Sequence, residues 1–458
     1  MENSYLNLNP MFLRSMEELL GEKQAADLRE ALASTPPVTA VRLNPLKKSS
    51  LKWDGDPVPW CSGGTILHDR PRFTFIPQLH SGAFYVQEPA SMMVGEIIRK
   101  IAPERPLAVL DLCAAPGGKT TAAVAALPAG SLMTANEFIP QRAVVLRENI
   151  QKWGHPAVTV TNSPTAAFAS VGPAFDIVIA DAPCSGEGMM RKDPEARAQW
   201  TPGLVEKCSA LQRTILADAV AALAPGGYLI YSTCTFNRLE NEENVAWAIN
   251  NFGLESIEIS IDPGWGIHPA IGSSHHCMRF FPHLTPSEGL FISVMRKTDG
   301  EKARLRVPKS KIKKADQSSN IKIPWINQST HMDLIAGDES VFAIPEEWHH
   351  LSIAIGSSAK VIYPGTEVAE IRGKDIIPAH PTVLSTLFIP DSFPSEELSK
   401  EESLRFLCRE NISLPCAPKG IVIPTFDSLP LGRIKNLGNR ANNLYPKNFR
   451  ILSRNFRT

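Results

Sequence analysis

The sequence lacks the features that mark membrane and secreted proteins. No stretch approaches the ~18 uninterrupted apolar residues of a membrane span, so we expect a soluble protein without a membrane partner. The eight cysteines include no CxxC pair, and the opening MENSYLNLNP has no basic-then-apolar signal pattern. These absences predict reduced thiols in the cytoplasm.

A metal site and a strong net charge are missing as well. The densest group of metal-binding residue types is His275, His276 and Cys277 with His283, and it has no second pair at zinc-ligand spacing, so we expect no metal. The 47 Lys and Arg residues balance the 47 Asp and Glu residues. Any nucleic-acid partner must therefore meet a local basic patch rather than a globally basic body.

The length of 458 residues predicts two or three domains. A helical pattern followed by Pro-rich chain indicates a small leading domain at 1–75. Alternating strand-like and helical runs fill 76–300. A polar, basic stretch predicts a linker at 301–322, and short β-like runs with prolines make up the C-terminal region 323–458.

The central region has the pattern of an α/β fold. Its β-rich runs, separated by helical segments, are LAVLDLCA, SLMTANE, AVTVTN, FDIVIADAPC, YLIYSTCT and FISVMRK. This alternation predicts a doubly wound, Rossmann-like domain, in which helices cover both faces of a mainly parallel sheet. Ligands of such sheets bind at the carboxyl ends of the strands.

A glycine turn follows the first of these strands, which delivers Asp111. Glycines there let the backbone approach a ligand, and Glu137 at the end of the second strand can hold both hydroxyls of a ribose. The sequence therefore predicts a nucleoside cofactor. The candidates from the turn are Cys113, Ala114, Ala115, Pro116, Gly117, Gly118 and Lys119.

Other interpretations fit this turn less well. A P-loop would match Gly118-Lys119-Thr120, but Cys113 stands where its first glycine belongs and the rigid Pro116 intrudes. The GxGxxG fingerprint of a dinucleotide site is absent here. A tight turn without a ligand is the remaining alternative, and the candidate residues on neighbouring strands argue against it.

Two cysteines end strands that we expect to be neighbours. Asp181-Ala182-Pro183-Cys184 closes the fourth predicted strand, and Ser232-Thr233-Cys234 closes the fifth. Adjacent strands lie ~4.8 Å apart, so both thiols would face one crevice. A single strand cysteine is more often a small buried hydrophobe, but two at corresponding strand ends favour a site.

The motifs DLCAAPGGKT, DAPCSGEGMMRKDP and STCT together resemble the Nol/Nop/Sun (NSUN) family of RNA cytosine-C5 methyltransferases, and FYVQEPASMM and RENIQKWG are similar to it too. The length and the C-terminal extension resemble the bacterial 16S rRNA methyltransferases of the F type. The tail LPLGRIKNLGNRANNLYPKNFRI is similar to their PUA-like RNA-binding module. The resemblance implies S-adenosyl-L-methionine as the cofactor and a cytosine C5 of RNA, above all small-subunit ribosomal RNA, as the target.

The implied chemistry explains a need for two thiols. Cytosine C5 is a poor nucleophile until a thiolate adds at C6, and the adduct must later lose H5 and eliminate the sulfur. The resemblance puts the addition on Cys234 of the Thr-Cys motif and the release on Cys184 of the Pro-Cys motif. DNA cytosine methyltransferases use the Pro-Cys thiol as nucleophile, so the presence of both motifs indicates the RNA arrangement.

Further site residues carry less specific signals. Asp181 could bond the cytosine N3/N4 edge, the cofactor's edge, or a helix start. Lys119 would be a catalytic-site cation or a solvated lysine, and Arg142 a ligand or a surface residue. Family members commonly have an acidic residue soon after the third strand, whereas this chain has Asn162 and Ser163, which could bond the adenine amino group instead.

RNA binding is predicted from a basic tail, because the target base must leave its stack and basic surface must offset that cost. The tail candidates are Arg433, Lys435, Arg440, Lys447, Arg450, Arg454 and Arg457. Arg191 and Lys192 lie near the expected site. A solvated charged face is the alternative, but Tyr445 and Phe449 and the resemblance favour RNA.

Other functions stay open at this point. The chain could methylate transfer RNA, or it could be a non-catalytic RNA-binding assembly factor that uses the fold as a platform. A small-molecule methyltransferase would leave the basic tail and the thiol pair unexplained. Without a coiled-coil pattern, we expect a monomer.

Overall fold

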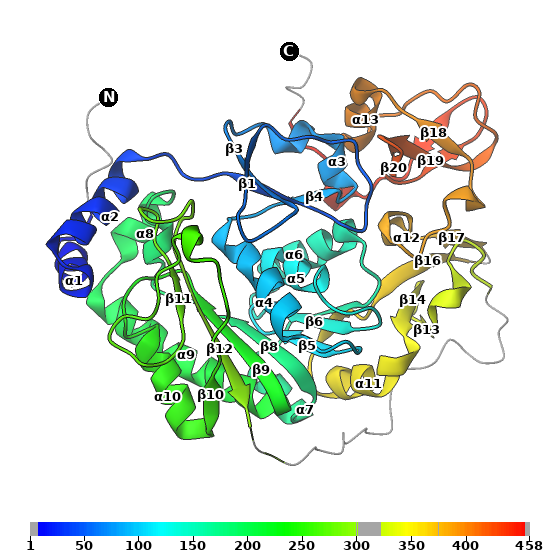
Figure 1. The fold of residues 1–458 in the computed structure, drawn as a ribbon. Helices are drawn as coiled ribbons and strands as arrows, with labels where there is room; N and C mark the ends of the chain where they lie inside the picture. The colour runs from blue at the N-terminus through cyan, green and yellow to red at the C-terminus, as the bar shows by residue number, and fades with distance from the viewer. Residues whose placement is uncertain (1–7, 299, 301–321, 374, 454–458) are drawn as a thin grey trace.

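The computed structural model describes residues 8–298, 300, 322–373 and 375–453. The predicted basic linker lies outside these residues except for Lys322, as do Arg454 and Arg457 of the tail. Figure 1 shows an N-terminal part, a large central sheet with helices on both sides, and a C-terminal part beside it. Within the described residues, no helix is both long enough and apolar enough to cross a membrane.

The N-terminal part consists of two helices and a small antiparallel sheet of order β2-β3-β1-β4. Its elements are α1 (Pro10–Leu20), α2 (Glu22–Ser34), β1 (Ala40–Leu43), β2 (Gly55–Pro57), β3 (Gly64–Leu67), α3 (Pro77–His80) and β4 (Phe84–Val86). Asn9 caps α1 by accepting a hydrogen bond from the Met11 backbone N–H, and Pro10 occupies the first turn. Because β4 pairs with β1, this part extends beyond residue 75, where the sequence placed its end.

The central sheet has the order β10-β12-β9-β8-β5-β6-β7-β15, with β11 pairing to β12. Its parallel strands are β5 (Ala108–Asp111), β6 (Leu132–Asn136), β7 (Val158–Thr161), β8 (Phe175–Asp181) and β9 (Leu223–Thr233). The antiparallel strands are β10 (Leu254–Ser256), β11 (Met278–Phe280), β12 (Leu290–Lys297) and β15 (Val361–Tyr363). The predicted α/β fold is confirmed.

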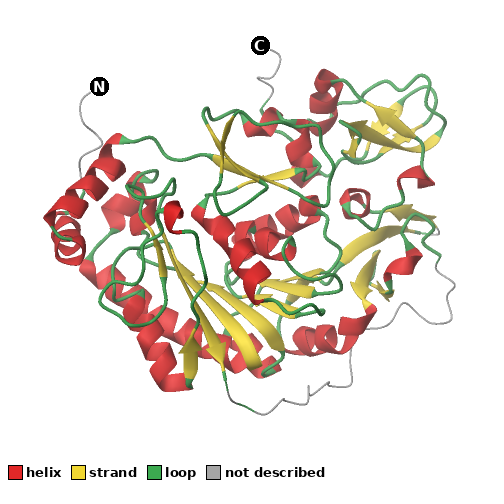
Figure 2. Ribbon diagram, in the orientation of Figure 1, coloured by secondary structure: helices red, strands yellow, loops and turns green. Residues whose placement is uncertain are grey.

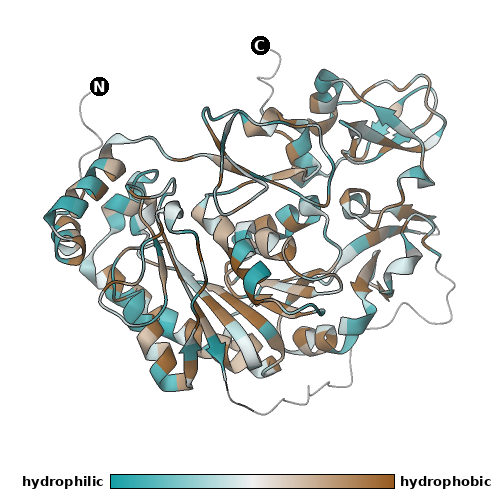
Figure 3. Ribbon diagram, viewed as in Figure 1, coloured by the Kyte–Doolittle hydropathy of each residue, from teal (hydrophilic) through white to brown (hydrophobic). Residues whose placement is uncertain are grey.

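Helices cover both faces of this sheet, as Figure 2 shows. One face carries α4 (Met93–Ile101), α5 (Gly118–Val124) and α6 (Pro140–Trp153), and the other carries α7 (Ala166–Val171), α9 (Pro202–Ala222), α10 (Glu242–Phe252) and α11 (His349–Ser358). Successive strand residues point to opposite faces, so Val109 joins the first core and Leu110 the second. The strands are accordingly apolar along much of their length (Figure 3).

The C-terminal part contains two small sheets of order β13-β14-β16-β17 and β18-β19-β21-β22, and β20 pairs with β19. The first comprises β13 (Met332–Ala336), β14 (Ser340–Pro345), β16 (Thr366–Arg372) and β17 (Asp375–Pro378), followed by α12 (His380–Leu384). The second comprises β18 (Ser395–Glu397), β19 (Gly420–Phe426), β20 (Leu429–Pro430), β21 (Ile434–Asn436) and β22 (Ala441–Asn443), with α13 (Lys400–Leu407).

The C-terminal part is built into the central domain. β15 pairs antiparallel with β7, and Leu351 and Ile355 of α11 belong to the core on one face of the sheet. At the end of α6, Gly154 has φ 79°, and a Cβ there would lie 2.1 Å from the Leu384 carbonyl oxygen. Only glycine fits both the left-handed helix cap and this close approach.

Candidate active site

The two strand-end cysteines lie together. Asp181 of β8 pairs in register with Ser232 of β9, so the chain leaves both strands at the same edge of the sheet. The sulfur atoms of Cys184 and Cys234 are 3.0 Å apart, and the Cys234 backbone N–H donates to the Cys184 sulfur at 3.2 Å. Both cysteines are free and partly buried.

An ion pair lies beside the thiols. Lys119 Nζ is 2.8 Å from Asp181 Oδ2, and the Ser232 hydroxyl donates to Asp181 Oδ1 at 2.7 Å. Burial opposes the charge of Lys119, but Asp181, and to a smaller extent Cys234, raise its pKa. Lys119 is therefore a buried cation within electrostatic reach of the Cys234 sulfur, and the side chain of Asp181 is held in an ion pair.

The two thiols differ in their environments. The hydrogen bond with Cys234 and then burial raise the pKa of Cys184 well above its usual range. Cys184 therefore remains a protonated thiol that can donate a hydrogen bond. The sulfur of its neighbour, Cys234, lies 3.0 Å away and is placed to accept that bond.

Buried polar contacts hold the glycine turn between β5 and α5. Asp111 is fully buried and accepts a hydrogen bond from the Thr120 hydroxyl at 2.7 Å, and burial raises its pKa to about 7. Burial likewise raises the pKa of Cys113. Arg142 donates to the Ala115 carbonyl at 2.7 Å and thus supports the turn, which answers in part the question of its role that the sequence left open.

Glu137 provides a test of whether a nucleoside cofactor fits. Its side chain is almost completely buried, and its Oε1 accepts a hydrogen bond from the Ile139 backbone at 2.9 Å. Its Oε2 has no hydrogen-bond partner among the described residues, and Arg142 Nη1 lies 3.5 Å away. A buried carboxylate oxygen without a donor is costly, and a ribose hydroxyl would supply that donor.

Asn162 and Ser163 at the end of β7 have structural partners. The Asn162 amide donates to the carbonyls of Glu137 and Phe138 at 2.8 and 2.9 Å. The Ser163 hydroxyl accepts from the Lys360 backbone N–H at 2.8 Å. These bonds tie the end of β7 to β6 and to the C-terminal part, and a contact with adenine stays a prediction.

Arg191 does not serve the predicted RNA contact. Its guanidinium is buried and bonds both carboxylate oxygens of Glu288, at 2.9 and 2.8 Å, together with the Ser287 carbonyl. That prediction was wrong, because a partner from a distant part of the chain takes up the charge. The neighbouring Lys192 is exposed.

The basic tail divides into buried and exposed residues. Arg433 is buried against Glu370 Oε1 at 2.6 Å, and Tyr445 and Phe449 belong to the core of the second small sheet. The prediction that Arg433 contacts RNA was therefore wrong, and the two aromatic residues that favoured RNA binding by the tail pack in the core instead. The exposed cations of the described tail are Lys435, Arg440, Lys447 and Arg450.

A set of buried polar residues behind the cysteines was not predicted from the sequence. Glu187 accepts hydrogen bonds from Trp200 Nε1 at 2.9 Å and from the Phe236 backbone at 2.6 Å, and Glu240 accepts from Ser185 and Gln212. The only signal in the sequence that sets these acids apart from surface acids is that Glu187 closely follows Cys184 and Glu240 closely follows Cys234.

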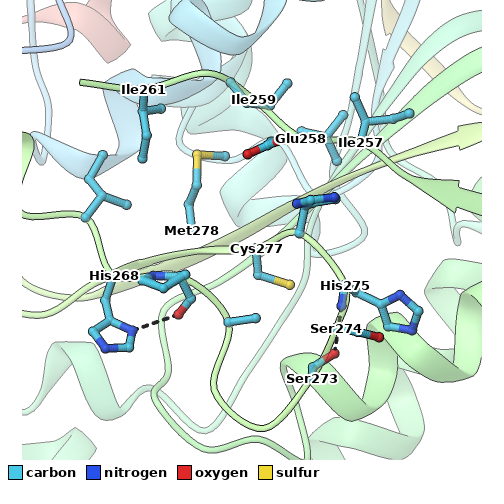
Figure 4. Close-up of a pocket in the computed structure, with 15 residues that line it drawn as sticks. Ile257, Glu258, Ile259, Ile261, His268, Ser273, Ser274, His275, Cys277 and Met278 are labelled. Carbon is cyan, nitrogen blue, oxygen red and sulfur yellow. Dashed lines mark hydrogen bonds between the residues drawn. The ribbon is translucent and has the colours of Figure 1, made fainter. Parts of the chain in front are cut away.

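A separate cavity of about 370 Å³ lies beside β11 and β12 (Figure 4). His268, His275 and Cys277 line it, the last two from the group that we weighed as metal ligands, and His268 Nδ1 lies 2.8 Å from the Pro269 carbonyl oxygen. Across the ranges that the structure describes, no three His, Cys, Asp or Glu side chains are grouped so as to hold a metal ion.

Comparison with known proteins gives matches along most of the chain. Residues 99–296 match the family model described as 16S rRNA methyltransferase RsmB/F, residues 8–89 the N-terminal domain of 16S rRNA methyltransferase RsmF, and residues 393–451 the methyltransferase RsmF PUA domain. The ribosomal RNA small subunit methyltransferase F of Escherichia coli O81 is 32% identical over 95% of both chains. The chain belongs to the RsmB/F family. The ribosomal RNA small subunit methyltransferase F of Cronobacter sakazakii is 30% identical to the chain, again over 95% of both chains.

Solved structures agree with membership of the RsmB/F family. A methyltransferase homolog protein from Pyrococcus horikoshii has a TM-score of 0.55 at 26% identity, over 65% of this chain and 100% of that one. NSun6 from the same organism, solved with SFG, has a TM-score of 0.56 at 21% identity, over 65% and 100%. The chain thus shares the fold of these structures over about two thirds of its length.

Proposed function

We propose that this member of the RsmB/F family methylates C5 of a cytosine in 16S ribosomal RNA, with Cys234 as nucleophile and Cys184 as the group that assists release. The observation that carries this proposal is the pair of thiols 3.0 Å apart, next to the Lys119–Asp181 ion pair. The resemblance of the two cysteine motifs gives each thiol its role. We further propose that the enzyme acts as a monomer in the cytoplasm.

The cofactor site is formed by the glycine turn and Glu137. Glu137 would accept hydrogen bonds from the ribose, and residues 113–118 would lie along the rest of the molecule. S-adenosyl-L-methionine supplies a methyl group on a sulfonium, which is reactive toward an electron-rich carbon. Asp181 stays the candidate for the N3/N4 edge of the cytosine: Lys119 and Ser232 each bond one oxygen of its carboxylate, and each oxygen can still accept a second hydrogen bond.

The electrons can be followed through the reaction. The Cys234 thiolate gives an electron pair to C6, and the pair of the C5=C6 bond moves to C5. That pair on C5 would form the bond to the methyl carbon, while the bond between the methyl group and the sulfonium would break and leave its pair on the cofactor sulfur. Water takes the C5 proton, the C5=C6 bond forms again, and the C6–S bond breaks with its pair left on Cys234. The Lys119 cation and the hydrogen bond from Cys184 stabilise this thiolate at both ends of the cycle.

RNA binding is proposed for residues 393–451 and for the exposed tail cations. The base must be extruded from its stack, which costs a few kcal/mol and favours loops over paired helices. Contacts between Lys or Arg and phosphate would offset that cost.

Exchange of each cysteine tests the assigned roles. Cys234→Ala should abolish methyl transfer, because it removes the thiolate that adds to C6 and without which C5 stays a poor nucleophile. Cys184→Ala should still add to C6 but release slowly, so that a protein–RNA adduct accumulates on a denaturing gel.

The exposed Cys416→Ala is the matched control and should behave like the unaltered enzyme. Adduct formation by Cys234→Ala, with none by Cys184→Ala, would reverse the two roles. Methylation of unmodified 16S rRNA is measured alongside from labelled cofactor.

A further inference from the structure

Glu240 is a fully buried acid behind the cysteine pair. Its Oε2 accepts from the Ser185 backbone N–H at 3.0 Å and from Gln212 Nε2 at 2.7 Å. Its Oε1 accepts from the Ser185 hydroxyl at 2.5 Å and from Asn237 Nδ2 at 2.8 Å. Burial raises the pKa of this carboxyl, while the bonds from Ser185 and Asn237 oppose the shift. With two donors on each oxygen, the group acts only as an acceptor, which is the bonding pattern of an ionised carboxylate.

These bonds connect the chain segments that follow the two cysteines. Ser185 comes directly after Cys184, and Asn237 comes three residues after Cys234. Gln212 of α9 adds a bond to the Pro183 carbonyl at 2.9 Å, on the other side of Cys184. Glu240 is thus the common acceptor that keeps the Cys184 segment against the Cys234 segment.

The charge of Glu240 also bears on Cys184. The pKa of this thiol is raised first by its bond to Cys234, then by burial, and further by the negative charge of Glu240. Because the Glu240 carboxylate is a fixed negative charge, a second negative charge on the Cys184 sulfur is unfavourable. Cys184 therefore stays protonated and faces Cys234 as a hydrogen-bond donor.

We propose that Glu240 is a positioning residue for release of the methylated base, because it holds Cys184 as a donor beside the Cys234 sulfur. The inference rests on the roles of the two cysteines under the proposed function. When the C6–S bond breaks, its electron pair stays on Cys234, and the Cys184 thiol stabilises that developing charge. Glu240 touches neither the base nor the cofactor in this scheme.

The test compares variants of the full chain with unmodified 16S rRNA and labelled cofactor. Glu240→Gln keeps the shape of the side chain but removes its charge and places an amide where an acceptor is needed. The adduct fraction should rise about tenfold, the effect of removing a buried hydrogen bond to a charged group, while first-turnover methyl transfer stays within about threefold. Glu243→Gln, at an exposed neighbour on α10, is the matched control and should show no rise.

Three further results decide the inference. In a Cys184→Ala background, Glu240→Gln should add no further adduct, because Glu240 acts through Cys184; a further rise overturns the inference. Should Glu240→Gln fail to fold, Ser185→Ala removes one of its four donors and must raise the adduct in the same direction. If Cys184→Ala traps adduct and neither of these variants does, Glu240 has no such role.

Failure of Cys184→Ala itself to trap adduct would instead refute the proposed cysteine roles.

Discussion

At the scale of the residue, Asp111 shows that the cofactor turn is held by a carboxyl group whose burial is unfavourable. Its carboxyl is fully buried, one oxygen accepts a bond from Thr120, and Oδ1 has no partner among the described residues. Burial therefore raises its pKa from 3.8 to about 7. The folded protein keeps a proton on this acid over a range in which the unfolded chain has already released it.

This difference predicts a pH-dependent stability. Between pH 3.8 and about 7 the folded state binds more protons at Asp111, so its contribution to the free energy of unfolding falls as the pH rises, and then levels off. Asp111→Asn removes the titration. The melting temperature of the variant relative to the unaltered protein should therefore increase across this interval.

Thermal unfolding at several pH values within the interval, without cofactor, measures the effect. The exposed Asp69→Asn serves as control and should leave the pH profile unchanged. Parallel profiles for Asp111→Asn and the unaltered chain would contradict the assigned titration.

Single residues also mark the limit of prediction from sequence. Cys184, Cys234 and Asp181 could be grouped beforehand, because each lies at or just after the end of a strand and parallel strands end at one edge of the sheet. Lys119 joins them because the turn after β5 leads into α5 at the same edge. The partners of buried cations, by contrast, could not be predicted from the sequence. Arg191 finds Glu288 across 97 positions of chain, and no local pattern indicates such a pair.

At the scale of the element, α1 and α2 support the site rather than the small N-terminal sheet. Phe12 of α1 contacts Trp200 with ring centroids 5.6 Å apart, and Trp200 donates to Glu187, which lies three residues after Cys184. Figure 1 shows both helices beside α8 (Pro194–Gln199) and apart from β1. The first helices therefore help to fix the chain that carries Cys184.

Truncating the Phe12 side chain should destabilise the protein. Phe12 is 1% exposed, so Phe12→Ala should lower the free energy of unfolding by about 3 kcal/mol or more, because apolar burial decreases and a cavity forms. The neighbouring Met11 is 59% exposed, and Met11→Ala should change this free energy little. Urea unfolding followed by tryptophan fluorescence distinguishes the two, and equal effects would contradict the packing described.

The length and burial of each strand decide whether it could be predicted from the sequence. Long apolar runs alternating with amphipathic helices predicted β5 to β9 and β12, because their burial on both faces leaves a clear pattern. The short β11 and β15 leave almost none. β15 has three residues, and its pairing with β7 depends on chain that is about two hundred positions away.

At the scale of the whole molecule, the C-terminal module combines an apolar interior with a charged exterior. Tyr445 and Phe449 hold its core, so deletion of the tail would unfold the module as well as remove its charges. Substitution of the exposed cations is therefore the sharper experiment for RNA binding.

Replacing Lys435, Arg440, Lys447 and Arg450 together by Gln should weaken binding to 16S rRNA and make it less dependent on salt. The log–log slope should decrease by about 0.7 for each phosphate that these cations no longer neutralise. Cofactor affinity should not change, because the glycine turn and Glu137 are untouched. Filter binding over a series of salt concentrations measures this.

Exchange of Lys for Arg and of Arg for Lys at the same positions keeps the charge and should keep the slope. An unchanged slope in the Gln variant would show that RNA binds elsewhere on the protein.

The pairing of β15 with β7 has a further consequence for the architecture. The open side of the catalytic sheet is closed by a strand that arrives only after the chain has left the domain, and Lys360 beside it bonds Asn162 and Ser163. A fragment that stops at residue 300 would present the bare N–H and C=O groups of β7 to solvent, an edge to which other chains can add. The catalytic domain is thus not separable from the C-terminal part, and a segment that is synthesised late completes the sheet that begins at residue 108.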